Sequence, residues 1–72
     1  MEPEVVTLIE VEDEGVLELM DGRRLQVNPG DISTAVLWLP TSTLEVLETD
    51  DGLFDLRVTL QGTTQQIRAR WE

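Results

Sequence analysis

Turn-forming residues divide the chain into short segments, and this spacing constrains the fold more than any other feature of the sequence. The turn signals recur roughly every 6 to 12 residues. Gly, Asn, Asp and Pro favour turns, because Gly and Asn tolerate the left-handed backbone and proline fixes φ. The signals are Asp13-Glu14-Gly15, Asp21-Gly22, Asn28-Pro29-Gly30, Pro40, Asp50-Asp51-Gly52 and Gln61-Gly62. This pattern is typical of strands in a meander or a small barrel.

The segments between the turns are rich in Val, Leu, Ile and Thr, which fit the pleated, half-buried surface of a sheet. We predict six strands, at residues 4–12, 16–20, 23–27, 44–49, 53–60 and 63–71. A chain of 72 residues lies near the lower end of what folds alone. We therefore expect a single small β-barrel domain over residues 1–72.

Successive side chains of a strand point to opposite faces, so alternation identifies the buried face. In the segment 53–60, apolar side chains fall on one face and polar side chains on the other. A two-residue turn at Gln61-Gly62 would place apolar residues opposite apolar residues and an acid opposite a base. The predicted pairs are Leu56 with Ile67, Phe54 with Ala69 and Asp55 with Arg68.

Odd-length turns bring the other strands into agreement with this face. With Gly22 as a left-handed bulge residue, Leu17 and Leu19 join the side of Leu25 and Val27. A three-residue loop at 13–15 pairs Val11 with Leu17 and Ile9 with Leu19, and an odd loop around 50–52 aligns Leu44 and Val46 with Val58 and Leu56. The predicted core is Ile9, Val11, Leu17, Leu19, Leu25, Val27, Leu44, Val46, Phe54, Leu56, Val58, Ile67, Ala69 and Trp71.

Two three-stranded meanders, 4–27 and 44–71, each leave one apolar face uncovered, and both faces are buried if they pack together. The expected fold is all-β, a six-stranded antiparallel and partly open barrel. Six short strands with one helical turn resemble the SH3-like small barrels in layout. The SH3 peptide-binding signature has no counterpart here, because the chain contains no tyrosine and one phenylalanine. The layout itself implies no function, because many unrelated functions share such barrels.

The connection 28–43 is the one irregular stretch. With Asp31 as N-cap, four apolar residues follow helical spacing and form one face, and Pro40 ends the pattern. These residues are Ile32, Ala35, Val36 and Leu39. We expect one short helix or 3₁₀ turn near 31–39 that caps one end of the barrel. The alternative is a further strand over residues 34–39, because Val36 and Trp38 also favour strands.

The residue types exclude most catalytic chemistry. Cys, His, Lys and Tyr are absent, so the usual nucleophile–base pairs, zinc sites and iron–sulfur sites have no ligands. The carboxylates fall in turns or on solvent faces, where nothing raises a pKa. We expect a chain that is not an enzyme and carries no cofactor. An acidic metal-binding module stays open as an alternative, through Asp50, Asp51 and Asp55 or the cluster Glu10, Glu12, Asp13 and Glu14.

The net charge is −10, from 15 acidic residues against five arginines. Such a surface repels phosphate backbones, which makes nucleic acid an unfavourable partner. Solubility, adaptation to high salt and a basic protein partner are three explanations that the sequence leaves open. The segment 1–10 holds three glutamates and no basic residue, unlike a signal peptide, and no apolar run is long enough to span a bilayer. We expect a cytoplasmic protein without membrane contact.

Two groups of residues have no assigned place in the core pattern and are candidate contact residues. The first group is Leu37 and Trp38, which lie off the predicted helix face, with the flanking Pro40; tryptophan is enriched at binding hot spots. The alternative is that Trp38 folds over the barrel end and fills it. The second group is the basic stripe Arg57, Arg68 and Arg70 on the last hairpin, which either pairs with nearby acids such as Asp55 or docks an acidic or phosphorylated partner. Val6 and Leu8 also point off the predicted core face, toward the connection or a dimer seam.

These observations favour a small acidic, non-catalytic interaction or scaffold module. It would dock onto a partner protein or form a homodimer, with the leucine–tryptophan group as anchor. A nucleic-acid-binding small barrel is the alternative, and it requires basic and aromatic residues that converge on one face despite the overall charge.

Overall fold

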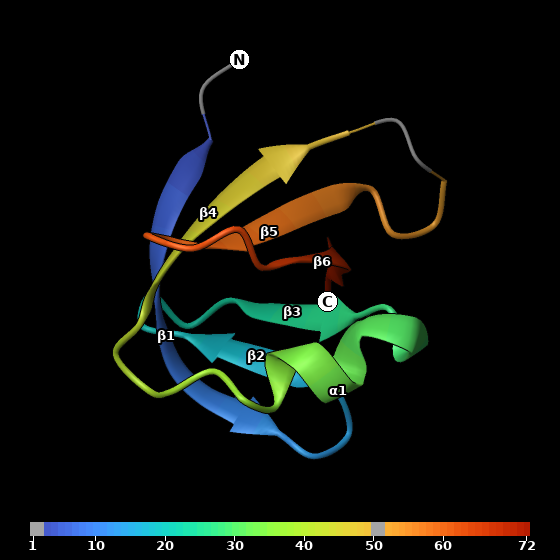
Figure 1. Cartoon of the computed structure of the whole chain (residues 1–72). Coiled ribbons are helices and arrows are strands. Elements are labelled where there is room, and N and C mark those ends of the chain that lie inside the picture. Colours follow the sequence, from blue (N-terminus) through green and yellow to red (C-terminus); the bar gives the residue numbers. More distant parts are fainter. Residues whose placement is uncertain (1–2, 50–51) are drawn as a thin grey trace.

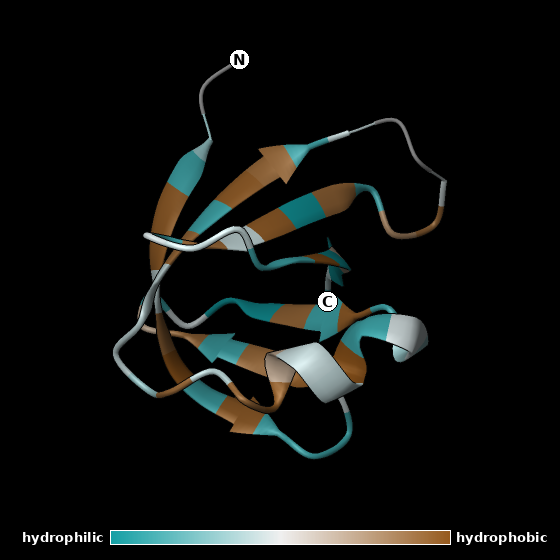
Figure 2. Ribbon diagram, viewed as in Figure 1, coloured by the Kyte–Doolittle hydropathy of each residue, from teal (hydrophilic) through white to brown (hydrophobic). Residues whose placement is uncertain are grey.

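The computed structural model describes residues 3–49 and 52–72 and shows an antiparallel barrel with one helical segment (Figure 1). At least one predicted turn separates each strand from the next in the sequence, so the spacing of the turn residues does determine the architecture. Figure 2 shows apolar and polar residues alternating along the strands. The elements are β1 (Glu4–Glu12), β2 (Val16–Leu19), β3 (Arg24–Val27), η1 (Pro29–Asp31), α1 (Ile32–Ala35), β4 (Thr43–Glu48), β5 (Leu56–Leu60) and β6 (Gln66–Trp71).

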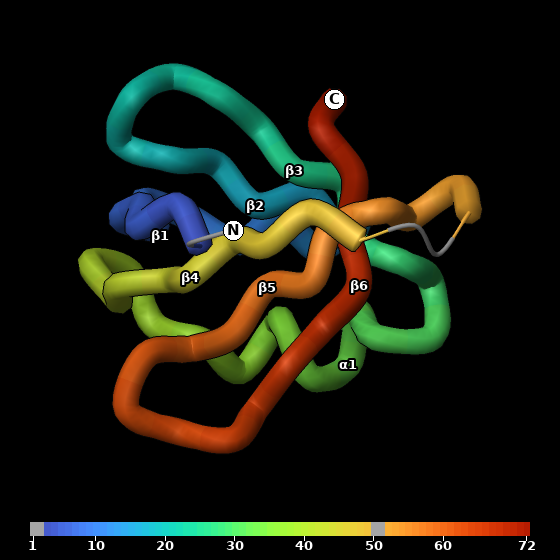
Figure 3. The backbone as a smooth tube through the Cα atoms, turned by 90° about the horizontal axis from the view of Figure 1, so that it is seen from above, coloured from blue at the N-terminus to red at the C-terminus, as the bar shows by residue number. Residues whose placement is uncertain are grey.

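The strand order around the barrel is β1-β2-β3-β6-β5-β4, and β4 pairs with β1 to close it. The two predicted meanders are therefore confirmed, and two seams join them: β3 with β6 and β1 with β4. In Figure 1, β6 lies between β3 and β5, as this order requires, and Figure 3 shows the same strands from above. We predicted a partly open barrel, but the barrel is closed, because β1 is long enough to pair with β2 and with β4.

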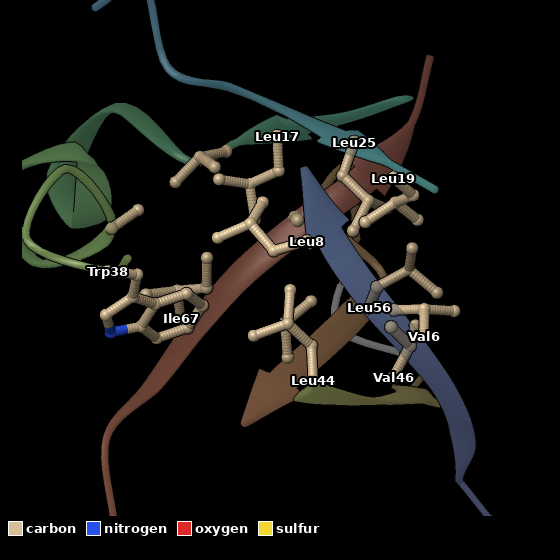
Figure 4. Packing of buried hydrophobic residues seen from close by; sticks show 14 residues of the cluster. Val6, Leu8, Leu17, Leu19, Leu25, Trp38, Leu44, Val46, Leu56 and Ile67 are labelled. Atoms are coloured by element: carbon tan, nitrogen blue, oxygen red, sulfur yellow. The ribbon is translucent and has the colours of Figure 1, made fainter. Parts of the chain in front are cut away.

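The interior holds one cluster of aliphatic side chains from all six strands (Figure 4). Predicted core residues that are buried are Leu17, Leu19, Leu25, Val27, Leu44, Val46, Leu56, Val58, Ile67 and Ala69. Val11 and Trp71 are partly buried and pack against this cluster. Phe54 was expected in the core but is only half-buried, because β5 begins after it, at Leu56.

A β-bulge in β1 changes which residues of that strand face inward. Leu8 pairs with Leu19 and Glu10 pairs with Glu18, so Ile9 is an extra residue between the two pairs. One extra residue reverses the alternation of side chains. The prediction for β1 was therefore wrong at three positions: Val6 and Leu8 are buried, and Ile9 is 41% exposed.

The registers of the second meander differ from the prediction by two residues. Leu56 pairs with Ala69, and Arg57 pairs with Arg68. Likewise Val46 pairs with Val58, and Leu44 with Leu60. The β5–β6 loop is longer than a two-residue turn, because the Leu60 amide donates to the carbonyl of Gln65. A slip of two residues leaves every side chain on its predicted face. For this reason, the predicted core residues of these strands are largely confirmed despite the wrong register.

The helical prediction for the connection is confirmed, and a strand over 34–39 is wrong. Pro29 begins the 3₁₀ turn, and the Asn28 side chain accepts a hydrogen bond from the Gly30 amide at 3.5 Å. Asp31 occupies the N-cap of α1 but makes no side-chain cap bond there. Its carboxylate instead accepts a hydrogen bond from the Arg68 amide at 2.9 Å, which fastens the connection to β6.

A network of contacts around Arg23, which lies in the turn after β2, joins this turn to β1 and β6. The guanidinium pairs with Glu4 of β1 and donates to Asp21 Oδ2 at 2.7 Å from Nε. It also lies over the Trp71 ring, with 4.4 Å between Cζ and the ring centroid. These contacts hold the β2–β3 turn against β1 and the end of β6.

Gly15 is a position where the fold requires glycine, and substitution there tests the packing of α1 on the barrel. Its φ is +89°, and an added Cβ would lie 2.6 Å from Ile32 Cδ1. Gly22 has a similar φ of +92° with open space around it, so it is a matched control. We expect Gly22→Ala to cost about 1 kcal/mol of unfolding free energy and Gly15→Ala roughly 2 to 4 kcal/mol.

Urea denaturation of each variant measures the difference. In an Ile32→Ala background, the extra cost of Gly15→Ala should disappear, because the clashing atoms are gone. Equal costs at the two glycines in the native background would contradict the contact between Gly15 and Ile32.

The pKa of Asp21 lies below its ordinary value, because the Arg23 side chain and then the Arg23 amide donate hydrogen bonds to its carboxylate. A carboxyl group with a lowered folded-state pKa stabilises the fold above its unfolded-state pKa, and this contribution is lost as pH falls through the folded-state pKa. We expect Asp21→Asn to destabilise the protein at pH 7 and to have little effect near pH 2. Thermal melts of both proteins across this range measure the difference, which high salt should reduce. A constant difference at all pH values would exclude the ion pair as its cause.

Candidate functional site

Trp38 is buried and belongs to the core, so it is not available as an exposed anchor. Its side chain is 4% exposed, and its Nε1 donates to Gln65 Oε1 at 2.8 Å. Figure 4 shows the ring at the α1 end of the aliphatic cluster. Of the two interpretations of Trp38, the one in which it fills the barrel end is therefore confirmed, and the exposed anchor is wrong for this residue, because α1 ends at Ala35 and the chain beyond it turns the indole inward.

The burial of Trp38 forces its neighbours outward and produces an exposed group that we call the apolar ridge. Leu37 is 76% exposed and Leu39 is 72% exposed. Val36 and Pro40 are exposed beside them. The predicted helix face was Ile32, Ala35, Val36 and Leu39. Of these four residues, Ala35 is buried in the core and Ile32 is partly buried against it, whereas Val36 and Leu39 are exposed. Val36, Leu37 and Leu39 lie within four positions of one another, whereas the other large exposed apolar residues of the described ranges are separate in sequence.

Backbone hydrogen bonds fix the chain on both sides of the ridge. The Trp38 amide donates to the Ala35 carbonyl at 3.0 Å, and the Thr41 amide donates to the Leu8 carbonyl at 2.7 Å. Thr41 has a φ of 70°, the only positive φ of a non-glycine residue in the described ranges. A β-branched residue in this region is strained, so the surrounding contacts must hold the turn in place. The ridge is therefore presented on a fixed segment.

The predicted basic stripe forms a compact group that we call the arginine face. Arg57 of β5 lies directly opposite Arg68 of β6, and Arg70 follows on the same face of β6. The sequence had placed Asp55 opposite Arg68, and the two-residue change in register replaces this acid with an arginine. Arg70 donates from Nε and Nη2 to Gln26 Oε1, at 3.2 and 2.9 Å. Its guanidinium also lies 5.8 Å from the Phe54 ring centroid.

The other two arginines are neutralised by carboxylates. Arg24 pairs with Glu12 at 2.6 Å and with Glu72 at 3.5 Å. Arg23 is held between Glu4 and Asp21. In contrast, the described residues place no carboxylate within ion-pair distance of Arg57 or Arg70. Arg57 and Arg70 therefore carry positive charge on the outer face of β5 and β6 that no described carboxylate pairs.

The described carboxylates do not converge on a metal site. In residues 3–49 and 52–72, no three Asp or Glu side chains are placed to hold one ion. The cluster Glu10, Glu12, Asp13 and Glu14 is spread over the end of β1 and its turn. Asp50 and Asp51, which we had also considered, lie outside the described residues. No helix in the described ranges is long and apolar enough to cross a membrane.

The sequence analysis missed several members of both surfaces. Leu39 was assigned to the buried face of a predicted helix, because the helical spacing of apolar residues continues past Ala35, where α1 ends. Gln26 and Phe54 gave no signal, because their role depends on which strands are neighbours around the barrel. The pairing of β3 with β6 brings Gln26 to Arg70. Comparisons with protein-family models, curated proteins and solved structures give no match.

Proposed function

We propose that this chain is a small, non-catalytic interaction module that docks onto a partner protein through the apolar ridge. The observation that carries the proposal is the exposure of Leu37 and Leu39 on either side of the buried Trp38. Single exposed leucines are ordinary, whereas adjacent ones on a fixed segment are typical of contact surfaces. The residue types of the chain also favour binding over catalysis, because Cys, His and Lys are absent.

The fixed geometry of the ridge favours binding. Association costs conformational freedom when loops must become ordered at an interface. Here Trp38 is held by the core and by Gln65, so the leucines beside it are already in position. Burial of two leucine side chains contributes about 3 to 5 kcal/mol in total. This is enough to make them the central contacts of a modest interface.

The charge around the ridge indicates the partner. Glu10, Asp13 and Glu14 are exposed, and the turn that holds the last two meets α1 through the contact of Gly15 with Ile32. The whole chain carries −10, so two copies repel one another. A partner with an apolar pocket and a basic rim satisfies both features, and it is favoured over a homodimer. A cytoplasmic location remains part of this proposal.

Replacement of both ridge leucines tests the proposal. We expect Leu37→Ser with Leu39→Ser to abolish capture of a specific partner from a native extract and to weaken its binding at least about tenfold in a titration with the purified partner. Leu53→Ser is the matched control, because Leu53 is 68% exposed and lies in the β4–β5 connection, away from the ridge. The double variant should melt close to the native protein, since exposed leucines add little stability.

Two results would count against the ridge, and a third would change its partner. Equal affinity of the native protein and the double variant would exclude it as the contact surface. An equal loss with Leu53→Ser would show that any exposed leucine contributes. Concentration-dependent dimers in sedimentation equilibrium, lost in the double variant, would replace the basic partner with a second copy.

A further inference from the structure

The arginine face brings like charges together across two strands. Arg57 and Arg68 are directly opposite across β5 and β6. Like charges in this position destabilise an antiparallel pair. The chain has 15 acidic residues and only five arginines, and three of those arginines share this face. Neither core packing nor the turn geometry requires arginine at outward positions.

The surroundings of the three arginines resemble a binding platform. Leu47 of β4 lies opposite Arg57, so one row across three strands reads Leu47, Arg57 and Arg68. Gln26 orients the Arg70 guanidinium through two hydrogen bonds, which leaves its other N–H groups available. Arg68 already has an interaction of its own, so the first contacts to a ligand fall to Arg57 and Arg70.

We propose that the arginine face binds a phosphoryl group carried by a segment of another protein. A phosphoryl group presents three acceptor oxygens and a charge near −2, which suits two or three guanidinium groups. Leu47 and Phe54 border the arginines and supply apolar contacts for the residues that flank the phosphorylated side chain. This surface lies on different elements from the apolar ridge and is a second site, separate from the function proposed above.

A protein segment is favoured over a nucleic acid by the total charge. The chain carries −10, so a strand with many phosphates is repelled over its whole length. In a basic peptide with a single phosphoryl group, the phosphoryl group is attracted by the arginine face, and the basic side chains are attracted by the acidic surface around it. Of the aromatic side chains, Phe54 alone lies against this face, and Trp71 packs against the core on the opposite face of β6, where Arg23 covers it. Stacking of successive bases therefore has no platform here.

The arginine Nε–Hε signals in ¹⁵N NMR spectra test the site directly. We expect inorganic phosphate, added at constant ionic strength against chloride, to shift the signals of Arg57 and Arg70 in a saturable way. The signals of Arg23 and Arg24 should not move, because carboxylates already hold these residues. Shifts that are absent, unsaturable or equal for all five arginines would overturn the proposal.

A peptide titration separates a protein ligand from other phosphates. The probe is a fluorescent peptide with one phosphoserine between lysines, compared with the same peptide unphosphorylated. We expect at least about tenfold tighter binding of the phosphorylated form, and at least about a tenfold loss in each of Arg57→Gln and Arg70→Gln. Arg24→Gln removes the same charge from a paired site, so it should change the affinity little.

The contrary outcomes are distinct. Equal binding of both peptides, or an equal loss in Arg24→Gln, would show that only the general charge of the protein matters. A higher affinity for a single-stranded RNA than for the phosphopeptide would replace the proposed ligand with a nucleic acid. Far-UV circular dichroism and melting curves verify that Arg57→Gln and Arg70→Gln are folded. Arg57→Gln should not lower the melting temperature, because it removes one of the two arginines that lie opposite each other.

Discussion

The closed barrel depends on the bulge at Ile9 in β1. Before the bulge, Val6 and Leu8 face the interior, and after it Val11 packs against the core. A regular strand would have to expose one of these groups, because strict alternation cannot put even and odd positions on the same face. The bulge also bends β1, so that its first half pairs with β4 and its second half with β2. One extra residue thus joins the two meanders around a single core.

Alternation and turn residues predicted most of the fold, and what they missed has a physical reason. The faces of Leu17, Leu25, Val58 and Ile67 were right, because side-chain parity follows from the sequence alone. The pairing of Leu56 was wrong by two residues, since a slip of two preserves every face and only loop length distinguishes the registers. The bulge was missed because apolar residues occur at both parities of β1.

The candidate surfaces were predictable as residue types but not as arrangements. Leu37 and Arg57 were identified from sequence because they had no place in the core. The inward turn of Trp38 depends on where α1 ends, and its partner Gln65 is far away in sequence. The opposition of Arg57 and Arg68 depends on the register that parity leaves undetermined. For this reason, Arg57 rather than Asp55 lies opposite Arg68 on the outer face of the hairpin.

The topology also determines how the chain can reach this structure. Each meander joins neighbouring strands through short loops, so its contacts are local and can form early. The seams between β1 and β4 and between β3 and β6 instead join segments far apart in the chain. The entropy of closing the long intervening loops must be overcome before these contacts form, which slows folding in β-rich topologies. We therefore expect docking of the two halves to be the slow step, and a truncated chain with one half to expose an unsatisfied apolar face that favours aggregation.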